Sequence, residues 1–340
     1  MQTTRAVLND LVLAGRREYG VEYSSNGLDG LQNHLPMCLY ALHAMGASDQ
    51  RLLDFYDWYV PRLTRRPAAT GRIERDDWRS ALGRHTANAE YFELFSEQAE
   101  GTSIERLLHE YLPELFSGVG GGGFHPLIRL AYALEMESRD ELCEALAAWC
   151  TVYAPLGEPE LIERRPLHES VTEIASDPYF RGARFTQRGI LRRMQQAAAD
   201  PRFAAALRRS APPKDGLVAS LAKLSLHTFL SAPSFVTLHL VTSSHALRVV
   251  DSIVPLRYEW LVGYWTAWLA AYVSLGAPDV RFDHTPRATR TWAEVLAETV
   301  AADDDHLNKL VYSCRQQFAA YDEPLYLDAA DLYCARTIRS

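Results

Sequence analysis

The sequence predicts an all-α protein, on two observations. Apolar residues recur at spacings of three and four through most of the 340 residues, which is typical of amphipathic helices. Alternating runs of β-branched residues are nearly absent, and helical spacing continues through the one serious strand candidate, residues 235–242. We therefore expect a single large multi-helix domain over residues 1–340 that closes around a central buried site. The predicted helices cover residues 51–63, 103–115, 127–154, 186–209, 216–230, 235–253, 258–274 and 304–320.

Breaks rich in glycine or proline fall at residues 66–71, 118–123, 211–213 and 276–278. The break at 118–123 satisfies the pattern GxGxxG, which marks dinucleotide binding when a strand precedes it and a helix follows it. No βαβ unit surrounds it here. We expect a turn that brings the backbone close to Phe124 and presents His125 near the start of the following helix.

Composition bounds the class of protein. Apolar residues make up 48% of the chain and charged residues 23%, so a sizeable core is expected. The net charge of -8 argues against a nucleic-acid partner. No secretory signal is apparent, and the apolar segment 260–275 is too short and too rich in Gly, Tyr and Thr for a membrane span. Five cysteines without a CxxC spacing indicate neither a disulfide framework nor a zinc ribbon. We expect a soluble, cytoplasmic protein; the oligomeric state stays open.

Several histidines lie in mostly apolar helical stretches, and imidazole is the commonest side-chain ligand of iron, zinc and copper. His34 by itself fits a buried structural residue as well as a ligand. His306 and Lys309 are three residues apart, which puts both on one helical face. The acidic run before them reads as a helix cap in a solvated turn. His239 and His245 are six apart and point to different faces, so we prefer His239 as the ligand and assign His245 to a supporting or substrate contact.

Lys309 has two interpretations. Burial of a protonated lysine is unfavourable, and it lowers the pKa of the amine. The side chain either reaches solvent or an acid such as Asp305, or it stays neutral and takes up carbon dioxide as a carbamate that binds metal like a carboxylate. Residue types alone favour the first interpretation.

The segments that hold these residues resemble the questin oxidase-like family. The matching stretches are 33–37 (NHLPM), 123–133 (GFHPLIRLAYA), 238–248 (LHLVTSSHALR) and 305–310 (DHLNKL), in the family's order. The resemblance implies an oxygenase of polyketide biosynthesis that opens an anthraquinone ring by Baeyer–Villiger-type oxidation. It also implies a non-haem iron(II) held by histidines and a carbamylated lysine. Residues 154–184 match no motif of the family, so the substrate pocket is expected to differ. The implied ligands are His34, His125, His239, His306 and Lys309, with His306 chosen over His245 from helix geometry.

Arg129 and Arg248 each lie near a candidate ligand in the sequence and would stabilise a substrate phenolate, with His245 completing the expected catalytic residues. Ion pairs of the two arginines with Glu135 and Asp251 are an equally good interpretation. The expected substrates are O2 and a flat aromatic polyketide, with NADPH as a possible reductant. Two other classes stay open. One is a flavin- or NADPH-dependent monooxygenase without metal, and the other is a non-catalytic helical protein that binds a polyketide.

Overall fold

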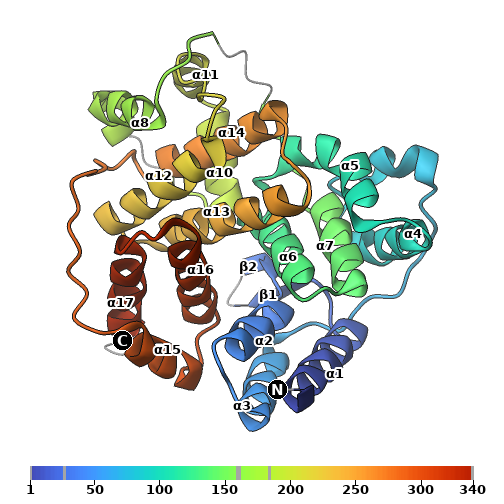
Figure 1. Ribbon diagram of the computed structural model, residues 1–340. Coiled ribbons are helices and arrows are strands. Elements are labelled where there is room, and N and C mark those ends of the chain that lie inside the picture. Colours follow the sequence, from blue (N-terminus) through green and yellow to red (C-terminus); the bar gives the residue numbers. More distant parts are fainter. Residues whose placement is uncertain (1, 26–27, 158–161, 183–184, 338–340) are drawn as a thin grey trace. The chain divides into compact units, whose positions relative to one another are not determined.

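The computed structural model describes residues 2–25, 28–157, 162–182 and 185–337 (Figure 1). Helices dominate, and the one sheet of the described residues is a two-stranded hairpin, so the predicted all-α class is confirmed. The chain divides into two compact units, Met1–Ala68 with His284–Ser340 (unit 1) and Ala69–Asp283 (unit 2). Closure of one domain around a central site stays a prediction. Among the described residues, no helix is long and apolar enough to cross a membrane.

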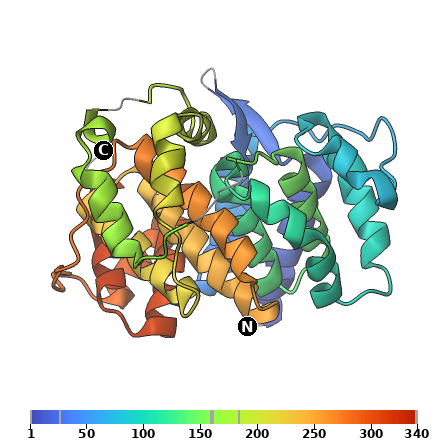
Figure 2. The same ribbon diagram turned by 90° about the horizontal axis from the view of Figure 1, so that it is seen from above.

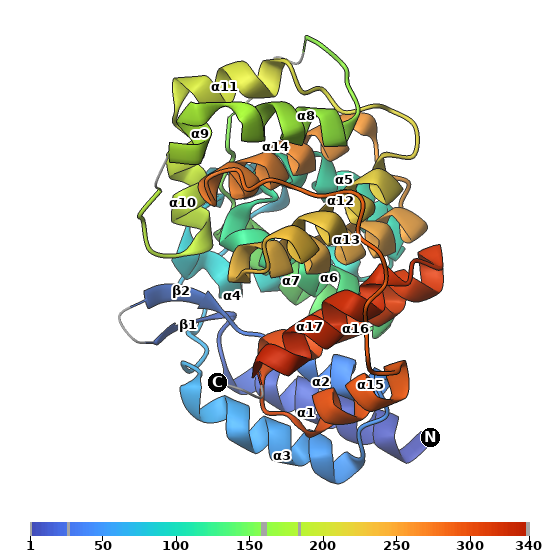
Figure 3. The same cartoon turned by 90° about the vertical axis from the view of Figure 1, so that its left-hand side faces the viewer.

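Unit 1 joins the two ends of the sequence, coloured blue and red in Figure 3. Helix α2 packs on α1, α3 and α16, and α16 also packs on α15 and α17. The strands pair antiparallel, Glu22 opposite Gln32. The elements are α1 (Gln2–Glu18), β1 (Glu22–Ser25), β2 (Leu28–Gln32), α2 (Leu35–Ala44), α3 (Asp49–Tyr59), a 3-10 turn (Val60–Arg62), α15 (Trp292–Ala301), α16 (Asp305–Tyr321) and α17 (Leu325–Thr337).

Local hydrogen bonds fix where α16 begins. The Asp304 carboxylate accepts from the backbone N–H groups of His306 and Leu307, which caps the helix. The Arg51 guanidinium of α3 donates to the carbonyls of Val300 and Ala302 just before this cap. Because these bonds tie α3 to the chain that enters α16, they set the position of the first turn of that helix.

Unit 2 is built from the middle of the sequence. Helix α6 packs between α7 and α13, and α13 also contacts α12 and α14, the yellow and orange helices of Figure 2. The elements are α4 (Asn88–Ala99), α5 (Ile104–Leu115), α6 (His125–Glu135), α7 (Arg139–Thr151), α8 (Leu167–Ser176), α9 (Pro178–Gly182), α10 (Ile190–Ala198), α11 (Pro201–Arg208), α12 (Leu217–Ser231), α13 (Phe235–Ile253) and α14 (Tyr258–Ser274), with 3-10 turns at Arg75–Ala81, His85–Ala87, Phe116–Gly118 and Gly121–Phe124.

Two predicted helices are wrong in extent. The helix expected over 127–154 is α6 and α7, separated at Glu137, which has φ of +57°. Ser138 starts α7 by accepting from the backbone N–H of Glu141. The helix expected over 186–209 is α10 and α11, because Asp200 caps a new helix whose first residue is Pro201. Residues 235–242 are helical as predicted, whereas the β1–β2 hairpin was not predicted.

Candidate metal sites

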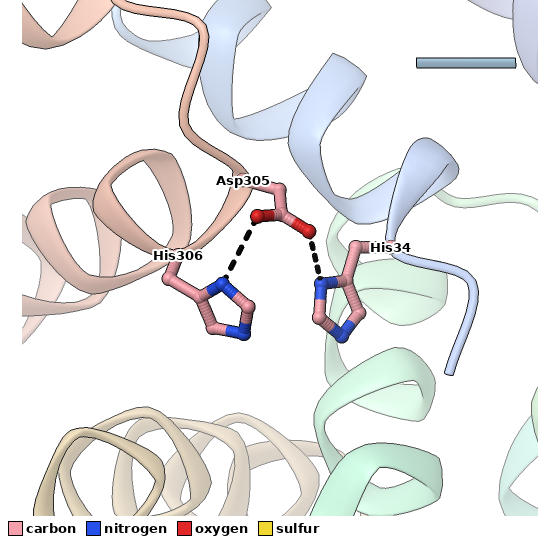
Figure 4. A group of neighbouring side chains, drawn as sticks. All are labelled: His34, Asp305 and His306. Atoms are coloured by element: carbon pink, nitrogen blue, oxygen red, sulfur yellow. Dashed lines mark hydrogen bonds and ion pairs between the residues drawn. The ribbon is translucent and has the colours of Figure 1, made fainter. Parts of the chain in front are cut away.

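In unit 1 the structure brings His34 and His306 together through a shared carboxylate (Figure 4). Asp305 Oδ2 lies 2.7 Å from Nδ1 of His34, and Oδ1 lies 3.0 Å from Nδ1 of His306. A carboxylate accepts hydrogen bonds, so each Nδ1 is the protonated donor and each Nε2 of a neutral ring carries the lone pair. Both Nε2 atoms point away from Asp305. This is the orientation that an outer carboxylate gives to metal-binding histidines.

The backbone around His34 is fixed by buried hydrogen bonds. Its N–H donates to the hydroxyl of Tyr59 at 2.9 Å. The neighbouring Asn33 amide donates to the carbonyl of Gly20 and accepts from the N–H of Leu35 at the start of α2. His34 is therefore held in place from both its main chain and its ring.

The charges of this cluster are strongly perturbed. Burial lowers the pKa of His34 to about 3, and the charge of Lys309 acts in the same direction. The ring is therefore neutral at physiological pH, as a metal ligand must be. Burial would raise the pKa of Asp305, but the imidazoles of His306 and His34 hold it well below its usual range. The expectation that the acidic run lies in a solvated turn is thus wrong for Asp305, which is 8% exposed, although Asp304 does cap the helix.

Lys309 lies one turn beyond His306 on α16 and is 1% exposed. Among the described residues its Nζ has no hydrogen-bond partner. Burial lowers the pKa of the amine to about 8, against the charges of Cys38, Asp305 and Asp304. Lys309 therefore does not reach solvent, and its lowered pKa increases the neutral fraction of the amine, which is the form that takes up carbon dioxide as a carbamate.

In unit 2 the structure brings His125 and His239 together. His125 is the first residue of α6 and His239 lies one turn inside α13. The Nδ1 atom of His125 is 2.5 Å from the carbonyl oxygen of Gly122, and that of His239 is 2.6 Å from the carbonyl oxygen of Phe235. Carbonyls only accept hydrogen bonds, so both Nδ1 atoms are protonated.

The two Nε2 atoms of this pair lie 3.3 Å apart. In neutral rings both carry lone pairs, which repel at this distance unless a cation lies between them. Bonds of 2.0–2.1 Å at a tetrahedral angle place two ligand nitrogens about 3.3–3.4 Å apart. The spacing therefore fits two nitrogens on one metal ion, and a proton shared between them is the other cation that fits.

The backbone before His125 adopts a left-handed conformation that glycine accommodates readily. Gly122, Gly123 and Phe124 all have positive φ, at 55°, 68° and 70°. A Cβ at Gly121 would lie 2.1 Å from the carbonyl oxygen of Val152, so this turn also allows a close approach of α7's end. The expected turn before His125 is present, and His125 begins α6; the expected flexibility of this turn stays a prediction.

Two of the three predicted catalytic residues pair with acids. Arg129 pairs with Glu141 at 2.8 Å, and both are buried, so an ion pair is found but with a different acid from the one expected. His245 is fully buried with Nε2 at 3.4 Å from Glu135. Arg248 is half-buried on α13. Roles for all three in catalysis stay predictions.

Sequence reasoning missed Tyr59 and considered Asp305 only as a partner of Lys309. Asp305 contacts His34 across 271 positions of sequence, and no local pattern reports such a contact. The ligand atoms of His34, Asp305 and His306 lie within 4.8 Å of one another. The structure thus groups the four predicted histidines as one pair in each unit.

These observations define an all-α protein with two histidine pairs, each with its Nδ1 atoms next to oxygen acceptors. A sequence model of the questin oxidase-like family matches residues 31–314, and the chain belongs to this family. The chain is also similar to oxidoreductase AflY of Aspergillus parasiticus, with 26% identity over 154 residues, which are 42% of this chain and 31% of that protein. The chain thus spans about a third of the length of the curated relative it matches. The names of both the family and the relative support an oxidoreductase.

Proposed function

We propose that the protein is a metal-dependent oxygenase that cleaves a carbon–carbon bond of a hydroxylated, anthraquinone-like polyketide. The observation that carries this proposal is the oxygen acceptor that lies next to each Nδ1 atom of the histidine pairs. In His125 and His239 both Nδ1 atoms are used by carbonyls, and in His34 and His306 both are used by Asp305. All four Nε2 atoms are thereby oriented as donors for a metal. The questin oxidase-like family and the AflY similarity support the reaction class.

Iron is the proposed ion, and bound there it would supply the redox chemistry that makes O2 reactive toward an aromatic ring. The residues proposed to hold iron are His34, His306 and Lys309 as a carbamate in unit 1, and His125 and His239 in unit 2. Asp305 orients two of the rings and its negative charge offsets that of a cation. The carbonyls of Gly122 and Phe235 hold the other two rings in the ligand tautomer. NADPH, or another external donor, would supply any electrons that the reaction needs.

Metal analysis of the purified full chain tests this proposal. We expect the wild-type protein to contain iron and to consume O2 in the presence of a hydroxyanthraquinone. We expect His125→Ala, His239→Ala and His306→Ala to lose both the iron and the O2 consumption. The matched control is His109→Ala, because His109 is exposed on α5. Loss of all metal in every ligand variant means that the histidines serve one ion, whereas partial loss means separate ions.

The other classes give different results. A metal-free monooxygenase would consume NADPH in the presence of chelators or purify with a yellow flavin. A binding protein would take up the hydroxyanthraquinone without consuming O2. Absence of any transition metal after reconstitution with iron, manganese or zinc would overturn the proposal.

A further inference from the structure

Helix α16 buries its polar side as well as its apolar side. A surface helix normally turns its polar side to water. Here the residues at 305, 308, 309 and 312 recur at spacings of three and four and are at most 8% exposed. The opposite side is apolar and equally buried, at positions 307, 310, 311 and 314. A buried polar face needs polar partners, because desolvated groups without hydrogen bonds are unfavourable.

Asn308 is a member of this face whose hydrogen-bonding groups the described residues do not satisfy. It is fully buried, and among the described residues neither Nδ2 nor Oδ1 has a hydrogen-bond partner. It lies one turn beyond Asp305 and next to Lys309, whose Nζ also has no partner in the part of the chain described. Two adjacent buried residues with three such atoms indicate a partner that comes from outside the chain.

Asn33 shows the ordinary alternative in the same unit. It is 4% exposed, and its amide both donates to Gly20 O at 2.9 Å and accepts from Leu35 N at 3.0 Å. Asn33 is thus satisfied by the chain itself, and Asn88, which is also buried, leaves only its Nδ2 atom without a partner among the described residues. Asn308 differs from both, because the described residues satisfy neither atom of its amide.

We propose that Asn308 contacts the substrate, where its amide nitrogen donates to a carbonyl and its amide oxygen accepts from a hydroxyl that lies beside that carbonyl on a planar ring system. A primary amide presents one donor and one acceptor group in one plane, which matches such a pair. A metal ion would use the oxygen alone and leave the nitrogen unpaired. The inference rests on the proposed function and deepens it, because it names the substrate groups that Asn308 of unit 1 would recognise.

The test compares two probes on the protein as purified, 1-hydroxyanthraquinone and unsubstituted anthraquinone, with binding measured without O2. We expect the wild-type protein to prefer the hydroxylated probe about tenfold or more, since a site built for a hydroxyl rejects the analogue that lacks it. The apolar isostere variant Asn308→Leu should bind both about equally. Asn308→Asp, which keeps the shape and loses the donor, should also lose most of the preference.

Thermal unfolding and metal content separate this role from a structural one. Asn308→Leu removes polar atoms that the free protein leaves unpaired, so its Tm should stay unchanged or rise. Asn33→Leu, the matched control, orphans two backbone groups and should lower Tm by roughly 3–8 °C. Unchanged probe selectivity in both Asn308 variants, or a Tm of Asn308→Leu as low as that of Asn33→Leu, would overturn the inference. The proposed function would survive either result if the metal content of the wild-type protein stands.

Discussion

Replacement of Lys309 by methionine should stabilise the metal-free protein at neutral pH. Burial lowers the pKa of this amine from 10.5 to about 8. The shift is about 2.5 pH units, which corresponds to roughly 3 kcal/mol of destabilisation of the folded state at about 1.4 kcal/mol per unit. Methionine keeps the shape of the lysine stem without its charge. At pH 7 we therefore expect Lys309→Met to raise the free energy of unfolding by about 3 kcal/mol.

The sign of the pH dependence follows from proton binding. The unfolded chain holds the Lys309 proton up to pH 10.5, whereas the folded chain releases it near pH 8. Between these values the unfolded state binds more protons, so the wild-type protein gains stability as pH rises. The advantage of the variant should fall to about 1 kcal/mol near pH 10.

Urea unfolding in buffers free of carbon dioxide measures the free energy of unfolding of both proteins. The difference between the two values isolates Lys309, because the titration of the other groups is common to both proteins. The exposed Lys223 supplies a control, Lys223→Met, whose difference from wild type should not change with pH. If Lys309→Met is less stable than wild type at pH 7, the amine has a stabilising partner, and the reasoning from burial is refuted.

Three further perturbations follow from the site. Asp305→Asn should weaken metal binding about 10–100-fold, measured by competition with a coloured chelator, because the amide cannot accept from both rings in their ligand tautomers; unchanged affinity would mean that Asp305 does not orient them. His34, whose pKa is lowered to about 3, binds its proton more weakly when folded, so stability is lost as pH falls from 6.5 toward 3. His34→Phe should reduce that loss in acid unfolding, and an identical acid profile would contradict it. Gly121→Ala should destabilise unit 2 by roughly 1–3 kcal/mol, because its Cβ would meet the Val152 carbonyl. Gly71→Ala, where a Cβ meets nothing within 4 Å, is the control in the same thermal unfolding assay.

Two helices have the bounds that the sequence predicts. The range 235–253 was exact, with Ser234 capping its start, and 258–274 was exact as well. The over-long predictions ignored local signals that are present in the sequence. Ser138 followed three residues later by Glu141 starts a helix, and Asp200 followed by Pro201 does the same. Apolar spacing that happens to stay in phase across such a cap conceals it.

The site was predictable where it depends on spacing within one helix. His306 and Lys309 follow one another on α16, and His125 starts a helix after the glycine turn, as expected. Asp305 was misjudged because its environment is decided by His34, which the fold brings from the other end of the chain. Whether an acid is solvated or shared between two imidazoles is a property of tertiary packing, and three aspartates in a row do not reveal it.

The two histidine pairs are oriented by acceptors of different kinds, and the two pairs therefore differ in which substitutions can disturb their geometry. Asp305 serves both rings of its pair, so one side-chain substitution affects both donors at once. The pair His125 and His239 uses main-chain carbonyls, which no substitution removes. Its geometry depends instead on backbone conformation, including the positive φ of Gly122, Gly123 and Phe124. A non-glycine residue in that region of φ is disfavoured by roughly 1–2 kcal/mol, and Phe124 bears that strain while its own side chain is completely buried. The backbone is therefore strained next to His125, whose Nδ1 already has a hydrogen-bond partner. Strain that is retained at such a position points to a functional role for the Nε2 atom of His125.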